Sequence, residues 1–563
     1  MKHEPKPPRR KLREQVPLLD CFTAPCKGGC PIHQDIPEYI ELCRKGAYAS
    51  ALRLITEKNP LPFITGTICA HNCMTKCMRN YYDEPVNIRA TKLVAAEKGY
   101  DAYMSKITPP APVTDGRKVA VIGGGPTGMS AAYFVGRAGI PVTLFEKADR
   151  LGGIVRQVIP AFRISDEAID KDVALMEKMG VEVKLNTEAP SVAELKAQGY
   201  THIFFAVGAW KAGRLDIPGN VVPVIGWLRD MKAGKDVSLG HVAVVGGGNT
   251  AMDAARAALR AGAKSSTLVY RRTKKYMPAD AEELELAVED GVRFLELVAP
   301  VEQANGKLKC EVMKLGDPDA QGRRKPVPTG EMVEIPCDTV VSAVGEKVES
   351  EVFTRNGITV DEKGIPAFKT NLEGVYAGGD AMRGPATVVE GIADAQYFAN
   401  AVIGEAHKFA IPAKAVATRE EAVAKKGVLC ESAKCEGDRC LTCNVVCQVC
   451  ADVCPNRANV VIELPDGRQQ ILHVDRMCNE CGNCAVFCPY DSAPYRNKFT
   501  LFLTREGFDE STENQGFLPL EGRKVLVRLD GKVFEADLDG QNDLPADVET
   551  FILTVLKDYA YLL

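Results

Sequence analysis

The chain has 563 residues, of which 26% are charged, and its net charge at pH 7 is -4. This length predicts three to four domains at roughly 150 residues per domain, and the near balance of charge argues against a nucleic-acid-binding protein. No run of about 20 apolar residues could span a membrane. The chain has 20 cysteines and no apolar signal segment, so we expect metal-binding thiols in a reducing, cytoplasmic environment rather than disulfides.

Two groups of three cysteines near the amino terminus flank a stretch that we expect to be helical. The groups are Cys21, Cys26 and Cys30, and Cys69, Cys73 and Cys77. Thiols that only fill a core do not recur at such short intervals, so these residues are candidate metal ligands. The arrangement resembles the amino-terminal domain of the glutamate synthase small subunit, which is shared with the flavin half of dihydropyrimidine dehydrogenase and with ferredoxin:NADP transhydrogenases.

In that family the domain is helical and holds two [4Fe-4S] clusters. The resemblance implies two ligand sets, which are Cys21, Cys26 and Cys77 for one cluster, and Cys30, Cys69 and Cys73 for the other. The chain departs from the family at Leu18, where a further cysteine is usual, and near Lys92, where a Glu or Gln ligand is usual. The identity of the fourth ligand of each cluster therefore stays open, and the candidates are Asp20, His71 and Cys43. The alternative is a cluster that is altered or absent.

The next segment has the pattern of a dinucleotide-binding fold. An apolar strand at 118–122 precedes a helix at 129–138. Between them stand Gly123, Gly125 and Gly128, spaced Gly-x-Gly-x-x-Gly. Such glycines permit a tight turn, close approach to a pyrophosphate and close helix packing. A second strand at 142–145 ends in Glu146, whose carboxylate suits an adenosine ribose, and Gly153 follows in a turn, so we expect a flavin nucleotide here.

The same pattern then repeats with one difference. A strand at 241–245 and a helix at 252–260 flank a second fingerprint, and the next strand covers 267–270. The fingerprint residues are Gly246, Gly248 and Ala251. After the last strand, the acid is replaced by Arg271 and Arg272. Arginines suit a 2'-phosphate where a carboxylate would bind the ribose of NAD, so this site predicts NADP, with solvated surface arginines as the alternative.

The segment 370–380 reads as a strand that ends in Asp380, with a helix at 386–396. It resembles the second flavin motif of flavoproteins with two dinucleotide-binding domains. That resemblance implies that Asp380 binds the ribitol or pyrophosphate side of FAD. It also implies an NADP domain inserted in a split FAD domain.

Two ferredoxin-like cysteine runs lie toward the carboxyl end. One run is Cys478, Cys481, Cys484 and Cys488, and the other is Cys443, Cys447, Cys450 and Cys454; a proline follows each. In two-cluster ferredoxins the last cysteine of each run binds the other cluster. The predicted [4Fe-4S] ligand sets are therefore Cys443, Cys447, Cys450 and Cys488, and Cys478, Cys481, Cys484 and Cys454. A pair of structural zinc sites is the alternative.

Three further cysteines precede these runs. Cys440 provides a fifth candidate ligand for the four places of the first run, so it can replace Cys443 or stand free. Cys430 and Cys435 lie in an expected exposed linker, with a further metal site as the alternative. The tail from 499 shows alternating strands and a closing apolar helix but no chemistry, and we expect it to serve docking or cluster shielding.

Together these segments predict an α/β protein with a helical iron–sulfur domain, two Rossmann-like domains and a carboxyl-terminal ferredoxin-like domain. The predicted boundaries are 1–112 for the helical domain, 113–232 and 339–410 for the FAD domain, 233–338 for the NADP domain, 411–429 for a linker, 430–498 for the ferredoxin-like domain and 499–563 for a small tail domain.

Most of the chain is similar to the iron–sulfur and flavin subunit of the selenate reductase type. The segments that carry this likeness are 59–66, 269–272, 277–279 and 478–484. The likeness gives no substrate, and we do not infer selenate.

The predicted function is that of an NADPH-dependent oxidoreductase subunit that passes electrons between NADP(H), FAD and [4Fe-4S] clusters. Nicotinamide moves an electron pair and a cluster moves one electron, whereas flavin can do both, so no catalytic side chain is needed. We expect a redox partner subunit or a ferredoxin, in a hetero-oligomeric complex. The alternatives are an electron-bifurcating subunit of a transhydrogenase or hydrogenase complex, and a glutamate synthase-type small subunit.

Overall fold

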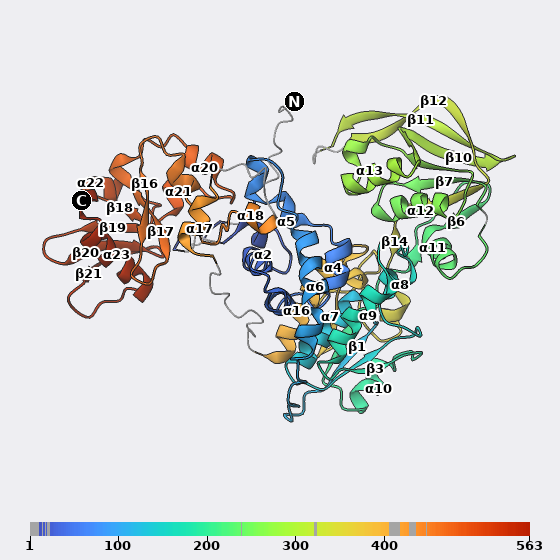
Figure 1. The fold of residues 1–563 in the computed structure, drawn as a ribbon, viewed down its shortest axis with the longest axis horizontal. Coiled ribbons are helices and arrows are strands. Elements are labelled where there is room, and N and C mark those ends of the chain that lie inside the picture. Colours follow the sequence, from blue (N-terminus) through green and yellow to red (C-terminus); the bar gives the residue numbers. More distant parts are fainter. Residues whose placement is uncertain are drawn as a thin grey trace. The chain divides into compact units, whose positions relative to one another are not determined.

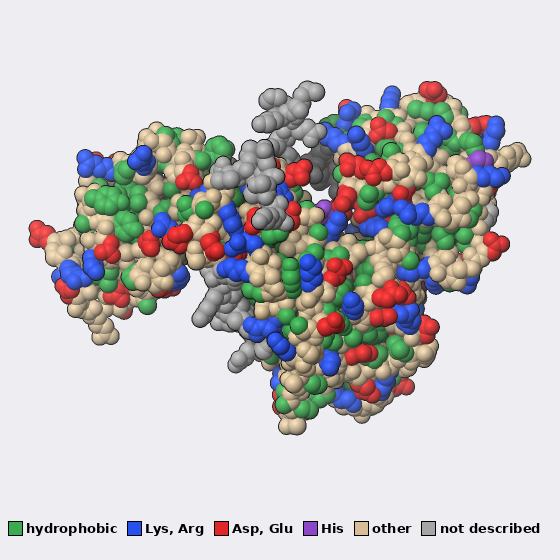
Figure 2. Space-filling view, viewed as in Figure 1, with side chains coloured by type: hydrophobic (Ala, Val, Ile, Leu, Met, Phe, Trp, Pro, Cys, Tyr) green, Lys and Arg blue, Asp and Glu red, His purple; other side chains and the backbone are tan. Residues whose placement is uncertain are grey.

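The computed structural model describes residues 11–563, apart from 14, 17, 20–22, 238, 320–323, 405–416, 427–434 and 446. The chain folds into two compact units. Unit 1 comprises Met1–Leu54, His71–Ala95 and Pro412–Leu563, and unit 2 comprises Ile55–Ala70 and Ala96–Ile411. Both ends of the chain therefore belong to unit 1. Figure 2 shows acidic and basic side chains mixed over the visible face of each unit, in agreement with the small net charge of -4.

The first sheet of unit 2 is parallel and is built around the first glycine fingerprint (Figure 1). Its strands, in spatial order, are β15 (Val375–Ala377), β4 (His202–Phe205), β1 (Val119–Ile122), β2 (Val142–Phe145) and β3 (Glu182–Lys184). The central strands are mostly apolar and buried, which is typical of parallel strands that are covered on both faces. Two helices, α7 (Pro126–Arg137) and α16 (Val388–Ile403), pack against each other beside this sheet.

The second parallel sheet of unit 2 lies, in sequence, between β4 and β15. Its strands, in spatial order, are β6 (Val221–Pro223), β13 (Thr339–Ala343), β7 (His241–Gly246), β8 (Ser265–Tyr270) and β9 (Arg293–Glu296). One Rossmann-like sheet is thus inserted in the sequence of the other. The predicted α/β class with a split first domain is confirmed.

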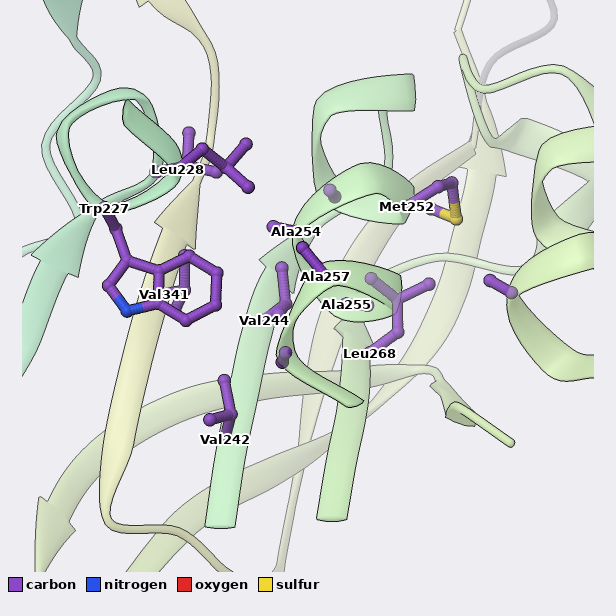
Figure 3. Packing of buried hydrophobic residues seen from close by; sticks show 14 of the residues in the cluster. Trp227, Leu228, Val242, Val244, Met252, Ala254, Ala255, Ala257, Leu268 and Val341 are labelled. Atoms are coloured by element: carbon purple, nitrogen blue, oxygen red, sulfur yellow. The ribbon is translucent and has the colours of Figure 1, made fainter. Parts of the chain in front are cut away.

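The core of the second sheet is made by small and branched side chains. The helix α12 (Asn249–Arg260) is rich in alanine, which allows it to pack closely on β7 and β8. Figure 3 shows Val244 and Leu268 beside the alanines of α12, with Trp227 of α11 (Val224–Lys232) completing the cluster. Each Å² of apolar surface that this core removes from water stabilises the fold by about 25 cal/mol.

Unit 2 also contains an antiparallel sheet of β10 (Val298–Ala304), β11 (Lys307–Pro318) and β12 (Arg324–Pro336), and a short pair, β5 (Lys211–Ala212) with β14 (Glu346–Lys347). Cys310 and Cys337 are fully buried in the hydrophobic cluster beneath the antiparallel sheet. The remaining helices of this unit are α4 (Pro62–Ile68), α8 (Gly153–Gln157), α9 (Asp166–Glu177), α10 (Val192–Ala197), α13 (Ala281–Glu289), α14 (Glu351–Thr354) and α15 (Asp380–Arg383), with a 3₁₀ turn at Lys274–Tyr276.

Unit 1 combines short helices with one six-stranded sheet. The strands, in spatial order, are β16 (Asn459–Glu463), β17 (Gln469–Val474), β18 (Thr500–Leu501), β19 (Gly516–Pro519), β20 (Lys524–Leu529) and β21 (Lys532–Asp537). The sheet contains strands from both sides of position 498, where the sequence suggests a boundary between the ferredoxin-like and tail domains. The division into six segments therefore stays a prediction.

The helices of unit 1 are α1 (Pro25–Gly28), α2 (Ile36–Arg44), α5 (Asn72–Thr75), α17 (Arg419–Ala424), α18 (Glu436–Arg439), α19 (Val449–Asp452), α20 (Asn483–Phe487), α21 (Pro494–Asn497), α22 (Arg505–Glu510) and α23 (Ala546–Asp558). Its 3₁₀ turns are Met78–Tyr81, Asp475–Met477 and Ala560–Leu562. Two helices, α3 (Tyr48–Thr56) and α6 (Ile88–Met104), are divided between the units. Among the described residues, no helix has both the length and the apolar character needed to cross a membrane.

Candidate functional site

Unit 2 has a cavity of about 490 Å³ whose wall brings together the predicted flavin residues. The lining includes Gly123 and Gly125 after β1, Glu146 after β2, Gly153 at the start of α8 and Asp380 at the start of α15. These residues come from the ends of neighbouring parallel strands, where open α/β sheets bind their ligands. The cavity is therefore the candidate flavin nucleotide site.

Two positions of the first fingerprint require glycine because any side chain there would collide with the backbone. Gly123 has φ +105°, and a Cβ atom there would lie 2.5 Å from the carbonyl oxygen of Ala206. Gly128 does not line the cavity, but a Cβ atom there would lie 1.8 Å from the carbonyl oxygen of Gly123. The first glycine thus permits the turn, and the third permits close packing of α7 on the strand.

Besides the short helices α8 and α15, three longer helices begin at this cavity. The first residues of α7, α12 and α16 line its wall, and these helices have 12, 12 and 16 residues. Free N–H groups and the positive end of the helix dipole favour anions at a helix N-terminus. The phosphates of a dinucleotide fit this wall. The start of α12 could not be assigned to the same cavity from the sequence, because it belongs to the second fingerprint.

The two acids of the predicted flavin site differ in their surroundings. Glu146 is 8% exposed and accepts hydrogen bonds from the backbone N–H groups of Gly124 at 2.6 Å and Ala148 at 2.8 Å. These bonds orient the carboxylate and leave each oxygen a further lone pair for a ribose hydroxyl. Asp380 accepts one bond, from the N–H of Ala386 at 3.1 Å. Burial, with smaller contributions from neighbouring carboxylates, raises the pKa of Asp380 to about 7.

The predicted NADP residues lie around the start of α12 and the end of β8. Gly246 ends β7, and Gly248 is the residue that caps α12. Arg271 is exposed, whereas Nε of Arg272 is buried and has no hydrogen-bond partner in the described part of the chain. A buried guanidinium nitrogen without an acceptor is costly, and an anion can satisfy it. This donor set fits a phosphate group.

An ion-pair network that sequence reasoning missed also borders the cavity. Nη1 of Arg163 lies 2.6 Å from carboxylate oxygens of both Asp253 and Glu283, and all three side chains are largely buried. Burial raises the pKa of Asp253 to about 6, although Arg163 lowers it. These residues are about 90 and 120 positions apart, and no local pattern marks them as partners.

One predicted cluster set is assembled around a single cavity in unit 1. The cavity has about 10 Å³ of free space and is lined by Cys454, Cys478, Cys481 and Cys484. The Sγ atom of Cys478 accepts a hydrogen bond from the N–H of Glu480 at 3.3 Å, and Cys454 accepts one from Ala458 at 3.2 Å. Backbone N–H groups aimed at thiolates are a known means of tuning cluster potentials. This donor set fits a [4Fe-4S] cluster.

The other ferredoxin-type set is less compact. Cys450 and Cys488 lie in one buried cluster with Tyr490. The pKa of Tyr490 is raised first by burial and then by the electrostatic effect of four thiols, those of Cys447, Cys26, Cys443 and Cys488. Cys443 also lines a second cavity, together with Cys26, Cys77 and Cys440.

The amino-terminal cysteines are only partly brought together. Cys26 and Cys77 share a cavity, as the resemblance implies, whereas Cys21, Asp20 and Cys430 lie outside the described residues. Cys30 and Cys73 belong to unit 1 and Cys69 to unit 2, so their common set stays a prediction. Cys435 is exposed. In the described ranges, no group of three or more Cys, His, Asp and Glu side chains is placed to hold a single metal ion.

Comparison with known proteins assigns the chain to a family. The family model "Pyridine nucleotide-disulphide oxidoreductase" matches residues 117–395, and the model "Dihydroprymidine dehydrogenase domain II, 4Fe-4S cluster" matches residues 9–102. The glutamate synthase [NADPH] small chain of Halomonas elongata is 32% identical over 428 residues, which cover 69% of this chain and 89% of that protein. The chain belongs to the glutamate synthase small-chain family. The predicted family is confirmed.

Two further relatives match a larger or similar share of the chain. The protein named "Putative oxidoreductase YgfK" of Escherichia coli O157:H7 is 41% identical over 97% of this chain and 56% of its own length. The NADPH-Fe(3+) oxidoreductase subunit beta of Geobacter sulfurreducens is 36% identical over 70% of this chain and 63% of that protein. The chain thus spans about half to two thirds of these two relatives. The chain contains an FAD/NADP-binding oxidoreductase domain and a 4Fe-4S domain, so the predicted enzyme class and cofactor types are confirmed, and the number of clusters stays a prediction.

Proposed function

We propose that the chain passes electrons between NADP(H) and a partner redox subunit or ferredoxin, with FAD and [4Fe-4S] clusters as the carriers. The observation that carries this proposal is the 490 Å³ cavity, where the predicted flavin residues and the start of α12 line one space. Bound flavin supplies the exchange between electron pairs and single electrons that nicotinamide and clusters require. The side chains supply binding and orientation.

In this proposal, each group of residues has one task. The N-termini of α7 and α16 and the Gly123–Gly125 turn hold the pyrophosphate of FAD, and Glu146 orients its adenosine ribose. Asp380 accepts a hydrogen bond from the ribitol or pyrophosphate side. Arg271 and Arg272 hold the 2'-phosphate of NADP, which supports a preference for NADPH over NADH.

We further propose that the chain works as a subunit of a cytoplasmic hetero-oligomer. Two of its relatives carry subunit names, a subunit beta and a small chain. The many candidate cluster ligands suit the reducing interior of a cell. Co-purification under anaerobic conditions would identify the partner.

An anaerobic titration tests the proposed activity. Adding NADPH to the oxidised protein should reduce the flavin absorption first and the broad iron–sulfur absorption afterwards, and NADH should act more slowly. The control is Gly123→Val, whose side chain would collide with the backbone of Ala206 and prevent the flavin site from forming. The proposal is wrong if NADPH bleaches neither chromophore in the wild-type protein.

A further inference from the structure

Four cysteines from distant parts of the chain line one cavity in unit 1. They are Cys26, Cys77, Cys440 and Cys443. The cavity has about 20 Å³ of free space, compared with about 10 Å³ in the cavity of Cys454, Cys478, Cys481 and Cys484. It therefore has at least as much room as the site with regular ferredoxin spacing. Neither ferredoxin spacing nor the family pattern groups these four residues.

The turn that carries Cys440 has the geometry of a cluster-binding turn. In Cys478-Asn-Glu-Cys481, the third residue Glu480 has φ +51°, and its N–H donates to the sulfur of Cys478. In Cys440-Leu-Thr-Cys443, the third residue Thr442 likewise has a positive φ, of +45°. A positive φ is uncommon for residues other than glycine. Cys440 is thus presented in the same way as a ligand of the regular run.

Cys77 and Cys440 line this cavity together with apolar side chains, among them Ile36, Ile40 and Val86. Cys440 is only 8% exposed, and Thr442 beside it is 2% exposed with a hydroxyl that has no partner in the described part of the chain. The surroundings are therefore shielded from water by apolar side chains, and such a hydrophobic shell controls solvent access to a metal cluster.

Specific contacts hold the segment 435–444 against the amino-terminal residues of unit 1. The N–H of Asn87 donates to Glu436 at 2.9 Å, and Arg439 donates to the carbonyl of Glu84 at 2.7 Å. At Gly437, a Cβ atom would lie 2.6 Å from Cβ of Arg44, so only glycine allows this approach. The position of Cys440 beside Cys26 is therefore built by its neighbours.

We propose that Cys440 is a ligand of the amino-terminal [4Fe-4S] cluster that Cys26 and Cys77 also bind, and that Cys443 remains with Cys447, Cys450 and Cys488. This assignment explains why the first ferredoxin run has five candidates for four places. It also supplies a thiol to the set in which Leu18 replaces the usual cysteine. The inference rests on the clusters of the proposed function.

Iron and acid-labile sulfide analysis of anaerobically purified protein gives the first test. Cys440→Ser should lower the iron content by up to about four atoms per chain, the content of one [4Fe-4S] cluster. The matched control is Cys435→Ser, five residues upstream and exposed, which should keep the wild-type content. Full retention of iron and sulfide, with unchanged electron paramagnetic resonance spectra, in Cys440→Ser would overturn the inference while leaving the proposed function intact.

Double variants decide which cluster Cys440 serves. If Cys440 shares a cluster with Cys26, the pair Cys26→Ser and Cys440→Ser should lose no more iron than Cys26→Ser alone. The double variant of Cys440→Ser and Cys447→Ser should lose about eight iron atoms, because two clusters are affected. The opposite pattern, additive with Cys26 and not with Cys447, contradicts the inference. Iron-free wild-type protein would instead contradict the proposed function.

Aspartate variants keep the test decisive if the serine variants fail to fold. A carboxylate can still bind iron, so Cys440→Asp should retain iron and change the resonance signal of one reduced cluster. The changed signal should be the one altered by Cys26→Asp. If it is the signal altered by Cys447→Asp, Cys440 belongs to the ferredoxin-type cluster and the inference is wrong.

Discussion

Asp380 shows what burial does to one ionisable residue. Its pKa is raised from 3.8 to about 7, chiefly because burial disfavours the charged carboxylate. The folded protein therefore binds this proton more tightly than the unfolded chain does. The associated stability is present below about pH 4 and is lost as the pH rises toward 7.

Asp380→Asn should remove this pH dependence, because an amide cannot ionise and its oxygen can still accept from Ala386. In flavin-depleted protein, we expect the unfolding midpoints of the variant and the wild type to coincide near pH 4. Above pH 7 the variant should unfold several degrees higher. Thermal scans across this range measure the difference. Exposed Glu373→Gln is the control, and a difference that does not vary with pH would contradict the role of burial.

The arginine pair predicts a change in nucleotide preference. Replacing Arg271 and Arg272 by alanine removes charge-assisted hydrogen bonds worth about 1.5–3 kcal/mol each. The kcat/KM for NADPH should therefore fall by at least about 100-fold, with that for NADH changed by about twofold at most. Steady-state rates with an artificial acceptor measure this ratio. The control is Arg214→Ala, because Arg214 is 83% exposed and pairs with Asp216; this substitution should leave the NADPH/NADH ratio unchanged. An unaltered ratio in the Arg271 and Arg272 double variant would contradict the predicted NADP preference.

Two helices with the same capping motif differ in what lies at their start. Both α16 and α17 begin with a capping box, formed by Thr387 with Glu390 and by Thr418 with Glu421. Thr387 lines the cavity of unit 2, whereas Thr418 is part of unit 1. The two caps therefore separate the stability of a helix from its contribution to the cavity.

Thr387→Ala and Thr418→Ala should each cost about 1 kcal/mol of local stability, because N–H groups in the first turn lose their acceptor. Only Thr387→Ala should weaken flavin binding, by several-fold, since its helix N-terminus faces the cavity. Flavin dissociation constants from fluorescence titration provide the measurement. Equal effects of both substitutions on flavin affinity would argue against the helix-terminus wall.

The whole molecule combines one unit with a nucleotide cavity and one with most of the cysteines. Removing iron with an oxidant and a chelator should destabilise unit 1, whose cysteine sets join residues from both ends of the chain. Calorimetry should show loss of the transition of unit 1, and the temperature of flavin release should stay within about 2 °C of the value for the untreated protein. Protein that lacks flavin but keeps its clusters should instead lose the transition of unit 2. Simultaneous loss of both transitions on chelation would mean that unit 2 depends on the clusters.

Local segments of this fold could be predicted because their signals are short. The strands at 142–145 and 241–245 appear almost as expected, and the strands and closing helix expected in the tail include β20, β21 and α23. The helices after the two fingerprints begin three residues earlier than expected, at Pro126 and Asn249, because each starts directly after its capping glycine. The strand expected at 370–380 is only Val375–Ala377, since Asp380 already opens a helix.

The sequence by itself determined the family, the two nucleotide fingerprints and the spacing of the regular cysteine run, because each depends on residues within about 30 positions of one another. Only the tertiary structure decided which distant groups meet. The pairing of Arg163 with Asp253 and the shared cavity of Cys26 and Cys440 are examples. Such meetings depend on how buried surfaces fit together, and a short sequence pattern carries no record of that packing.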